Sequence, residues 1–232
     1  MDTAHASHTT TKLGVEPFLE LSRHYPVIDV RTSAEFAKGH IPGAMNIPLF
    51  SNEERAIIGT TYKQVGQREA MLLGLEIVGP KMRHLIEHIQ TVATERTLLL
   101  HCWRGGMRSE SVAWLAGLFG YRCYTLRRGY KGFRNYVLQM LELPSRLLIL
   151  GGKTGSGKTE ILQVLKQQGE QVIDLEGLAH HKGSSFGALG EADQPSQQQF
   201  ENELAMQWRQ LNLQRPVWLE DESRHIGKLS IP

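Results

Sequence analysis

The stretch Thr97-Leu98-Leu99-Leu100-His101-Cys102-Trp103-Arg104-Gly105-Gly106-Met107-Arg108-Ser109 begins as an apolar run and ends as a loop rich in glycine and arginine. Such apolar runs are typical of buried strands in parallel sheets, and the apolar spacing over residues 109–118 is helical. The loop therefore connects a strand to a helix and places Cys102 close to the start of that helix.

Helix N-termini favour negative charge, because their backbone N–H groups have no partner within the helix. We therefore expect Cys102 to react as a thiolate, with Arg104 and Arg108 adding positive charge beside it or beside an anionic substrate. A buried structural cysteine is the alternative, but such cysteines usually have apolar neighbours.

The segments around this loop alternate between apolar runs and helical patterns. We predict strands at residues 26–31 and 122–126, a short helix at 34–38 capped by Thr32 or Ser33, and mostly helix over 52–90 with breaks near Gly59, Gly66 and Gly79-Pro80. This alternation predicts an α/β fold with a parallel sheet covered by helices on both faces. Cys123 is expected to be a small buried residue of its strand.

A second loop, Gly152-Lys153-Thr154-Gly155-Ser156-Gly157-Lys158-Thr159, matches the phosphate-binding pattern G-x-x-x-x-G-K-[ST] in full. A predicted strand (146–150) precedes it and a predicted helix (159–168) follows it, which is the context that the pattern requires. We expect the loop amides to surround phosphate oxygens, Lys158 to neutralise their charge, and Thr159 to bind Mg²⁺.

Acidic residues follow the predicted strand at 216–219. Asp221, or its neighbour Glu220, is therefore the candidate acid for assisting Mg²⁺. With residues 171–174, the second half of the chain has three predicted strands, whereas sheets of this kind usually have about five. We therefore expect a phosphate-loop α/β domain that is incomplete at Pro232.

The composition is that of an ordinary globular protein, with 232 residues, 41% hydrophobic and 22% charged, and a net charge of +2. We expect a disordered leader over residues 1–14, a first domain over 15–140 and the incomplete second domain over 145–232. No apolar run is long enough for a membrane span. The two cysteines suggest neither a disulfide framework nor a structural metal site, which predicts a reducing, cytoplasmic setting.

Basic residues gather between residues 121 and 134, where no acidic residue occurs. They are Arg122, Arg127, Arg128, Lys131 and Arg134, interleaved with Tyr121, Tyr124, Tyr130 and Phe133. The pattern indicates an anion-binding patch, with a solvated helix end as an equal alternative.

Short motifs ahead of the cysteine loop carry a family resemblance. They are Asp29-Val30-Arg31, Glu35-Phe36, Gly39-His40-Ile41-Pro42-Gly43-Ala44 and Asn46-Ile47-Pro48. With the cysteine loop they resemble a rhodanese domain, which implies a five-stranded parallel α/β fold, a persulfide-carrying nucleophile at Cys102 and an internal ion pair between Asp29 and Arg31. Arg108 departs from the family, because it lies six residues after Cys102 instead of five. This spacing is similar to that of dual-specificity phosphatases and favours a phosphate-sized anion such as selenophosphate.

Further motifs extend the resemblance over residues 26–232. They include Asn52-Glu53-Glu54-Arg55, Gly129-Tyr130-Lys131, Asp174-Leu175-Glu176-Gly177-Leu178-Ala179, His181-x-Gly183-Ser184-x-Phe186-Gly187 and Leu219-Glu220-Asp221-Glu222-Ser223-Arg224. With the two loops they resemble the tRNA 2-selenouridine synthases. The resemblance implies that the sulfur of 2-thiouridine at the tRNA wobble position is replaced by selenium from selenophosphate. It also implies that a geranyl group from geranyl diphosphate is attached to that sulfur.

The same resemblance implies roles for individual residues. Cys102 would serve the selenium step, either as a perselenide carrier or as the nucleophile that helps to expel geranylthiol, while the phosphate loop would hold the diphosphate. The candidates for the prenyl or base pocket are Glu176, His181, Ser184 and Phe186. A helix cap is the alternative for Glu176, and a solvated loop histidine for His181. The anticodon stem-loop of tRNA is the expected partner, with phosphate contacts at Arg127, Arg128, Lys131 and Arg134. We expect no tightly bound cofactor, with Mg²⁺ as a candidate.

Three other functions would use part of this set. A phosphate-loop kinase or ATPase with a rhodanese-like docking module would depend on Lys158 and not on Cys102. A phosphatase would hydrolyse aryl phosphates through Cys102, although Trp103 is larger than the residue that such loops usually carry there. A plain sulfurtransferase would form thiocyanate from cyanide without the phosphate loop.

Overall fold

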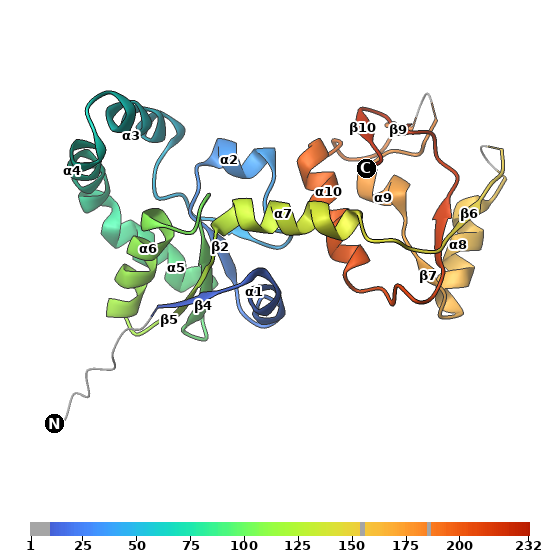
Figure 1. Ribbon diagram of the computed structural model, residues 1–232, viewed down its shortest axis with the longest axis horizontal. Helices are drawn as coiled ribbons and strands as arrows, with labels where there is room; N and C mark the ends of the chain where they lie inside the picture. Colours follow the sequence, from blue (N-terminus) through green and yellow to red (C-terminus); the bar gives the residue numbers. More distant parts are fainter. Residues whose placement is uncertain (1–9, 154–155, 185–186) are drawn as a thin grey trace. The chain divides into compact units, whose positions relative to one another are not determined.

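The computed structural model describes residues 10–153, 156–184 and 187–232, and the chain divides into two compact units at residues 134 and 135. The first unit contains a five-stranded sheet in the order β1-β5-β4-β2-β3, in which every neighbouring pair is parallel. Strands β2, β4 and β5 of this sheet are labelled in Figure 1. The strands are β1 (Thr11–Leu13), β2 (Val27–Asp29), β3 (Met45–Asn46), β4 (Thr97–His101) and β5 (Arg122–Leu126). The predicted parallel α/β fold is confirmed.

Helices cover both faces of this sheet, because side chains alternate along each strand. The helices are α1 (Val15–Leu21), α2 (Ser33–Lys38), α3 (Asn52–Gln64), α4 (Gln67–Val78), the 3₁₀ turn η1 (Gly79–Lys81), α5 (Met82–Val92), α6 (Met107–Leu118) and α7 (Gly129–Leu141), which continues across the division between the units. Leu98 and Leu100 of β4 lie in one buried cluster with side chains of α5 and α6. His101 lies on the other face, near the rings of Phe18 and Tyr130.

Several predicted boundaries of the first unit are confirmed. The strands 97–101 and 122–126 have the expected ends, and Thr32 caps α2 in a capping box with Glu35. Helices end at Gly66 and at Gly79-Pro80 as predicted, but the break predicted at Gly59 is wrong, since α3 runs through it. A single glycine inside a helix costs only about 1 kcal/mol, which neighbouring helical residues can offset.

The prediction of a disordered leader over residues 1–14 is wrong for its last residues. Residues 11–13 form β1, which pairs in parallel with β5 so that Thr11 lies opposite Tyr124. Lys12 also forms an ion pair with Glu110 of α6. This edge strand has no apolar run of its own, and it forms because the free edge of β5 supplies hydrogen-bond partners. Residues 1–9 lie outside the described part of the chain.

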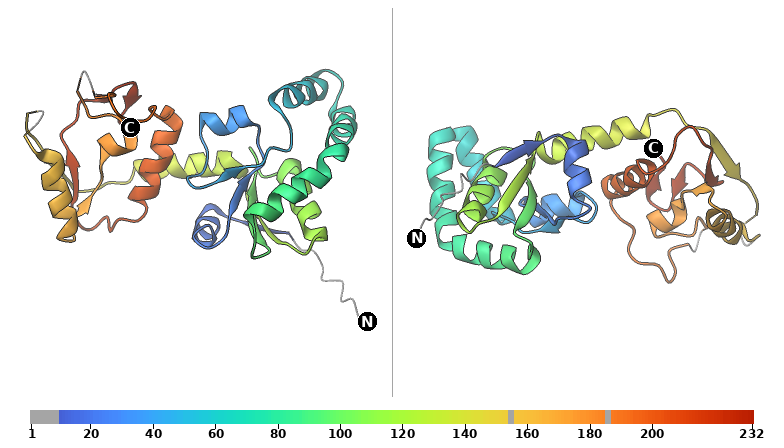
Figure 2. Two further views of the ribbon diagram at one scale, coloured as in Figure 1. Left: turned by 180° about the vertical axis from the view of Figure 1, so that it is seen from behind. Right: turned by 90° about the horizontal axis from the view of Figure 1, so that it is seen from below.

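The second unit contains a three-stranded parallel sheet in the order β6-β8-β7, which confirms three predicted strands. Figure 2 shows this unit in yellow to red. Its elements are β6 (Leu147–Leu150), α8 (Lys158–Gln167), β7 (Gln171–Val172), α9 (Leu175–Ala179), α10 (Gln197–Trp208), β8 (Val217–Glu220) and an antiparallel pair, β9 (His225–Ile226) and β10 (Leu229–Ser230). The predicted strand 171–174 ends early, because the Asp174 side chain accepts a hydrogen bond from the Gly177 amide and caps α9.

The core of the second unit lies between β8 and the helices α9 and α10. It contains Ile173, Leu175, Leu178, Ala179, Phe200, Leu204, Val217, Leu219, Ile226 and Leu229. Leu219 belongs to this core, so the next residue, Glu220, points to the opposite side of the strand, where the phosphate loop follows β6. None of the helices within the described ranges is both long and apolar enough to cross a membrane.

Candidate functional site

The cysteine loop follows β4 at the carboxyl edge of the first sheet and leads into α6. Cys102 is buried, with 4% of its surface exposed. The Ser109 hydroxyl donates a hydrogen bond to its sulfur over 3.3 Å, and the sulfur lies 3.8 Å from the carbonyl oxygen of Gly106. Cys102 therefore lies against the first turn of α6, as predicted, where local N–H groups favour an anion.

The first turn of α7 fixes the backbone of this loop. The amides of Tyr130 and Lys131 donate hydrogen bonds to the carbonyl oxygens of Cys102 and Trp103, over 2.8 and 3.0 Å. Gly129 has a φ of +54°, and a Cβ atom there would collide with the carbonyl oxygen of Cys102. Only glycine accepts both the backbone angle and this close approach.

The two arginines of the loop have different surroundings. Arg104 is exposed, whereas Arg108 forms hydrogen bonds to both carboxylate oxygens of Glu35 in α2, at 2.9 and 3.4 Å. Burial opposes the ionisation of Glu35, but these hydrogen bonds hold its pKa below the ordinary value. The charge of Arg108 is thus compensated, so an anion in the loop has to compete with Glu35 for it. The motif Glu35-Phe36 does not predict this contact, which only the fold shows.

The predicted ion pair between Asp29 and Arg31 is confirmed, and it is completely buried. Arg31 donates three side-chain hydrogen bonds to the two carboxylate oxygens of Asp29 and one, of 2.8 Å, to the carbonyl of Gly39. Its guanidinium carbon also lies 3.8 Å from the centre of the Tyr130 ring. The pair therefore supports Tyr130, whose amide binds Cys102, and does not line an open surface.

The phosphate loop lies between β6 and α8, the context predicted from its sequence. Gly157 has a φ of +83° just before α8, and the Lys158 ammonium group donates a hydrogen bond to the carbonyl of Gly152 over 3.1 Å. The predicted residues Gly152, Lys153, Ser156, Gly157, Lys158 and Thr159 are described, while Thr154 and Gly155 lie outside the described residues.

Glu220, rather than Asp221, faces the phosphate loop. One of its carboxylate oxygens lies 3.2 Å from the Lys158 ammonium group, and the other lies 3.5 Å from the Thr159 hydroxyl. Asp221 is exposed. Of the two acids that the sequence offered, Glu220 is therefore the one placed to share a cation with Thr159.

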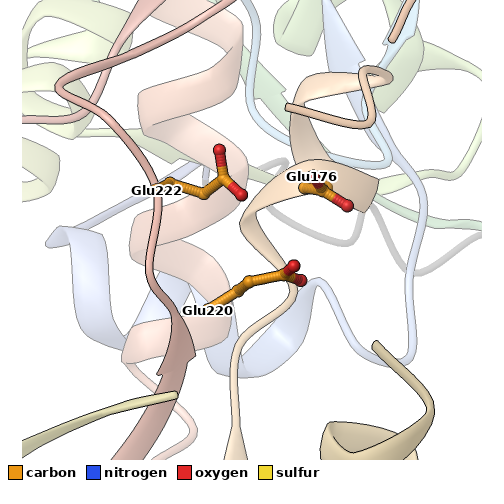
Figure 3. A group of neighbouring side chains, drawn as sticks. All are labelled: Glu176, Glu220 and Glu222. Atoms are coloured by element: carbon orange, nitrogen blue, oxygen red, sulfur yellow. The ribbon is translucent and has the colours of Figure 1, made fainter. Parts of the chain in front are cut away.

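Three carboxylates gather beside this ion pair, as Figure 3 shows. Glu220, Glu222 and Glu176 of α9 bring oxygen atoms within 4.8 Å of one another, a donor set that a divalent cation could use. Burial, followed by the charges of Glu220 and Glu222, raises the pKa of Glu176 to about 7, and burial also raises the pKa of Glu222. A Cβ atom on Gly183 would meet the carboxylates of both Glu176 and Glu222, so the loop approaches them closely.

The remaining pocket candidates lie in the loop that follows α9. His181 is half-buried, and its Nδ1 atom has no hydrogen-bond partner within the described residues. Ser184 is half-buried, and its carbonyl accepts a hydrogen bond from Gly187. Phe186 lies outside the described residues. The structure thus brings Glu176 to the phosphate loop, and Asp174 rather than Glu176 caps α9.

The basic stretch 121–134 is not an alternating basic and aromatic surface. Tyr121, Tyr130 and Phe133 are buried and Tyr124 is half-buried, in or next to β5 and α7. The exposed members are Arg122, Arg127, Arg128 and Lys131, while Arg134 is half-buried. The interleaving of aromatic residues therefore reflects the core of the first unit, and only the basic side chains remain for an anion.

A parallel five-stranded sheet with a cysteine loop after its central strand, followed in the chain by a phosphate loop, defines a rhodanese-like domain joined to a phosphate-loop unit. Residues 16–136 match the family model described as a rhodanese-like domain, and residues 145–232 match the model described as the tRNA 2-selenouridine synthase AAA domain. The chain thus belongs to the rhodanese-like domain family through its first unit, and its second unit is similar to the AAA domain of the tRNA 2-selenouridine synthases, the family that its motifs resemble.

Relatives with this name agree over most of the chain. The protein of Nitrosomonas europaea is 41% identical over 216 residues, which cover 89% of this chain and 55% of the relative. That of Hydrogenovibrio crunogenus is 42% identical over 223 residues, which cover 90% and 60%. The chain thus spans little more than half the length of these relatives. A crystal structure of the N-terminal domain of a Clostridium difficile 630 protein is 36% identical, with a TM-score of 0.49, and covers 55% of this chain and 99% of that one.

Proposed function

We propose that the chain takes part in replacing sulfur by selenium at position 2 of the wobble uridine of tRNA. One observation carries the proposal: a rhodanese-type cysteine loop and a phosphate loop occur together in a chain whose relatives, 41 and 42% identical, are named tRNA 2-selenouridine synthase. The two loops offer a nucleophilic sulfur at Cys102 and a phosphate-binding ammonium group at Lys158. We assign each loop to one step of a two-step reaction in the cytoplasm.

The phosphate loop suits an S-geranylation step. The sulfur of 2-thiouridine attacks C1 of geranyl diphosphate, the C–O bond breaks, diphosphate leaves with the electron pair, and N3 of the base loses its proton. Lys158 and the loop amides neutralise the diphosphate. The oxygens of Thr159 and Glu220, 3.5 Å apart, fit Mg²⁺, which when bound would add further positive charge there.

The cysteine loop suits the selenium step. The Cys102 thiol attacks C2 of the base, the C–S bond to the geranylated sulfur breaks, and geranylthiol leaves with the proton of Cys102. Selenium of selenophosphate then displaces the cysteine sulfur from C2, which restores Cys102, and water releases the phosphate group from selenium. Cys102 acts here as the nucleophile, because a perselenide carrier would need a two-electron oxidant to bond the selenide-level selenium of selenophosphate to its sulfur. Arg108 binds the selenophosphate anion once that anion displaces Glu35 from it.

Exposed basic side chains supply the tRNA contacts in this proposal. Arg127 and Arg128 precede α7, and Lys131 lies in its first turn, directly beside the cysteine loop. These residues bind phosphates of the anticodon stem-loop without reading its sequence. Half-buried Arg134 is the weakest of the four candidates.

The test is a nucleoside analysis of modified RNA. An anticodon stem-loop with 2-thiouridine is incubated with geranyl diphosphate and then with selenophosphate, and its nucleosides are identified by mass spectrometry. We expect Cys102→Ala to geranylate without selenation and Lys158→Ala to lose geranylation. The Nitrosomonas europaea relative serves as the positive control for the assay. If that relative modifies the RNA and this chain leaves it unchanged, the proposal is wrong, and nucleotide hydrolysis becomes the next assay.

A further inference from the structure

Trp103 is a large apolar residue within the cysteine loop. It directly follows Cys102, and 36% of its surface is exposed while only 4% of the Cys102 surface is. A substrate therefore reaches the buried sulfur past the exposed side chains of the loop, of which Trp103 is the largest. Part of the indole beside the nucleophile is therefore accessible to a ligand that reaches the loop.

The position of this indole is fixed by the structure beneath it. The carbonyl of Trp103 accepts the hydrogen bond from the Lys131 amide, and its ring lies 5.9 Å from the ring of Tyr130 at a tilt of 43°. Tyr130 is fully buried and carries the Arg31 guanidinium group on its ring. Trp103 thus lies against a buried aromatic ring and exposes part of its own ring to solvent.

The charges around Trp103 are positive. Arg104 follows it in the loop, and Lys131 binds its backbone; both side chains are exposed. The backbone of Arg128, whose side chain is exposed, also approaches the loop, because a Cβ atom on Gly105 would lie 3.0 Å from the Arg128 amide nitrogen. An exposed aromatic ring among basic side chains is the arrangement by which proteins hold single-stranded RNA, with the base stacked on the ring and the phosphates bound by the cations.

We infer that Trp103 is the platform on which an unpaired pyrimidine base of single-stranded RNA stacks beside Cys102. This inference rests on the proposed function and names the residue that holds the base for it. A 2-thiouridine base is flat and polarisable, so it stacks well on an indole. The wobble base lies in a loop of the RNA and can turn outward without breaking a base pair.

Fluorescence of the tryptophans tests this stack directly, and the chain offers a matched control. Trp114 lies on α6 of the same unit, eleven residues after Trp103, and is 56% exposed. The probe is an anticodon stem-loop RNA with 2-thiouridine at the wobble position. A second RNA has an abasic nucleotide there. Affinity is measured by anisotropy of the labelled RNA.

We expect the RNA to quench tryptophan emission in wild type and in Trp114→Leu, and the quenching to be lost in Trp103→Leu. Stacking of a base on an aromatic ring contributes on the order of 1–3 kcal/mol, so Trp103→Leu should weaken binding about tenfold, and Trp103→Phe less. The abasic RNA should bind wild type and Trp103→Leu equally, since the stack is already missing. Unchanged alkylation of Cys102 by iodoacetamide in Trp103→Leu confirms that the loop is intact.

Three results overturn the inference, and they differ in what they mean for the function. If wild type and Trp103→Leu bind the 2-thiouridine RNA equally, Trp103 is only a cover for Tyr130 and the proposed function stands. The same holds if Trp103→Leu weakens the abasic RNA as much as the intact one. If wild type binds neither RNA, the proposed function falls as well.

Discussion

The ammonium group of Lys158 lies 3.2 Å from a carboxylate oxygen of Glu220, and their side chains are only 11% and 7% exposed. The same ammonium group binds the Gly152 carbonyl, and the second Glu220 oxygen lies near Thr159. The phosphate-loop lysine is therefore neutralised by a carboxylate from the neighbouring strand. A diphosphate in the loop therefore has to compete with Glu220 for Lys158. Alternatively, a cation has to replace Lys158 as the partner of Glu220.

This pair predicts a stability cost for removing the lysine alone. Lys158→Met leaves the Glu220 carboxylate buried without its partner, which should lower the free energy of unfolding of the second unit by about 3 kcal/mol. Lys158→Met combined with Glu220→Gln should recover part of that loss. Urea unfolding measures both, and Lys166→Met on the exposed face of α8 is the control. Equal stability of Lys158→Met and Lys166→Met would show that the ion pair contributes nothing.

Gly129 gives a second prediction. The cost of a collision with its neighbours can be measured separately from the cost of its positive φ, by comparison with Gly43. Gly129→Ala places a methyl group against the Cys102 carbonyl, whereas Gly43, at a φ of +79°, has open space around an added Cβ atom. Gly43→Ala should therefore cost only the backbone strain of roughly 1–2 kcal/mol. Gly129→Ala should cost more and should also change the rate at which Cys102 reacts with iodoacetamide.

The rate of alkylation by iodoacetamide measures the reactivity of Cys102 alone. Iodoacetamide reacts with thiolates, and burial raises the pKa of the Cys123 thiol to about 12, so Cys123 stays protonated. Gly43→Ala should leave this rate at the wild-type value. An unchanged rate in Gly129→Ala would mean that the first turn of α7 does not position the cysteine loop.

The strands of the core could be predicted from the sequence, whereas contacts between distant segments could not. Residues 97–101 form a strand because their apolar run has no alternative to burial, and the same run fixes the position of Cys102. Nothing in Thr11–Leu13 predicts a strand, because β1 depends on the free edge of β5. The ion pair of Arg108 with Glu35 joins residues 73 positions apart, which no local pattern shows.

The local sequence pattern predicts part of the arrangement of the three carboxylates, and the rest depends on the fold. Glu220 and Glu222 share a side of the chain because side chains alternate along an extended segment, and Leu219 in the core fixes which side that is. The sequence predicted Asp221, or its neighbour Glu220, because the core contact of Leu219 was unknown. Glu176 joins them from α9, and only the fold reveals that meeting.

The raised pKa of Glu176 predicts a pH effect on the second unit. In the unfolded chain this carboxyl ionises near its ordinary pKa of 4.5, whereas in the folded chain it keeps its proton up to about pH 7. The folded state therefore binds more protons in this window, so stability falls as pH rises from 4.5 to 7. Glu176→Gln is neutral throughout and should show a smaller fall between pH 5 and pH 7.5.

Urea midpoints at the two pH values measure this difference, with the fluorescence of Trp208 and Trp218 as the signal in a Trp103→Phe/Trp114→Phe background. Glu142 is an exposed residue of the same unit, so the urea midpoint of Glu142→Gln should fall between the two pH values as much as that of wild type. A fall in Glu176→Gln as large as in wild type would assign the pH effect to other groups.

His101 predicts a pH effect of opposite sign in the first unit. Its ring is fully buried, neither nitrogen has a hydrogen-bond partner among the described residues, and burial lowers its pKa from 6.5 to about 4. Between these values the unfolded chain takes up a proton that the folded chain does not, so stability is lost as pH falls through this window. His101→Leu takes up no proton in either state and should keep more of its stability at pH 5 relative to pH 7.

The urea midpoint of the first unit measures this difference, with the fluorescence of Trp103 and Trp114 as the signal in a Trp208→Phe/Trp218→Phe background. His88→Leu, an exposed histidine of α5, should behave as wild type does; if His101→Leu does so too, His101 is not the group that makes the first unit sensitive to acid.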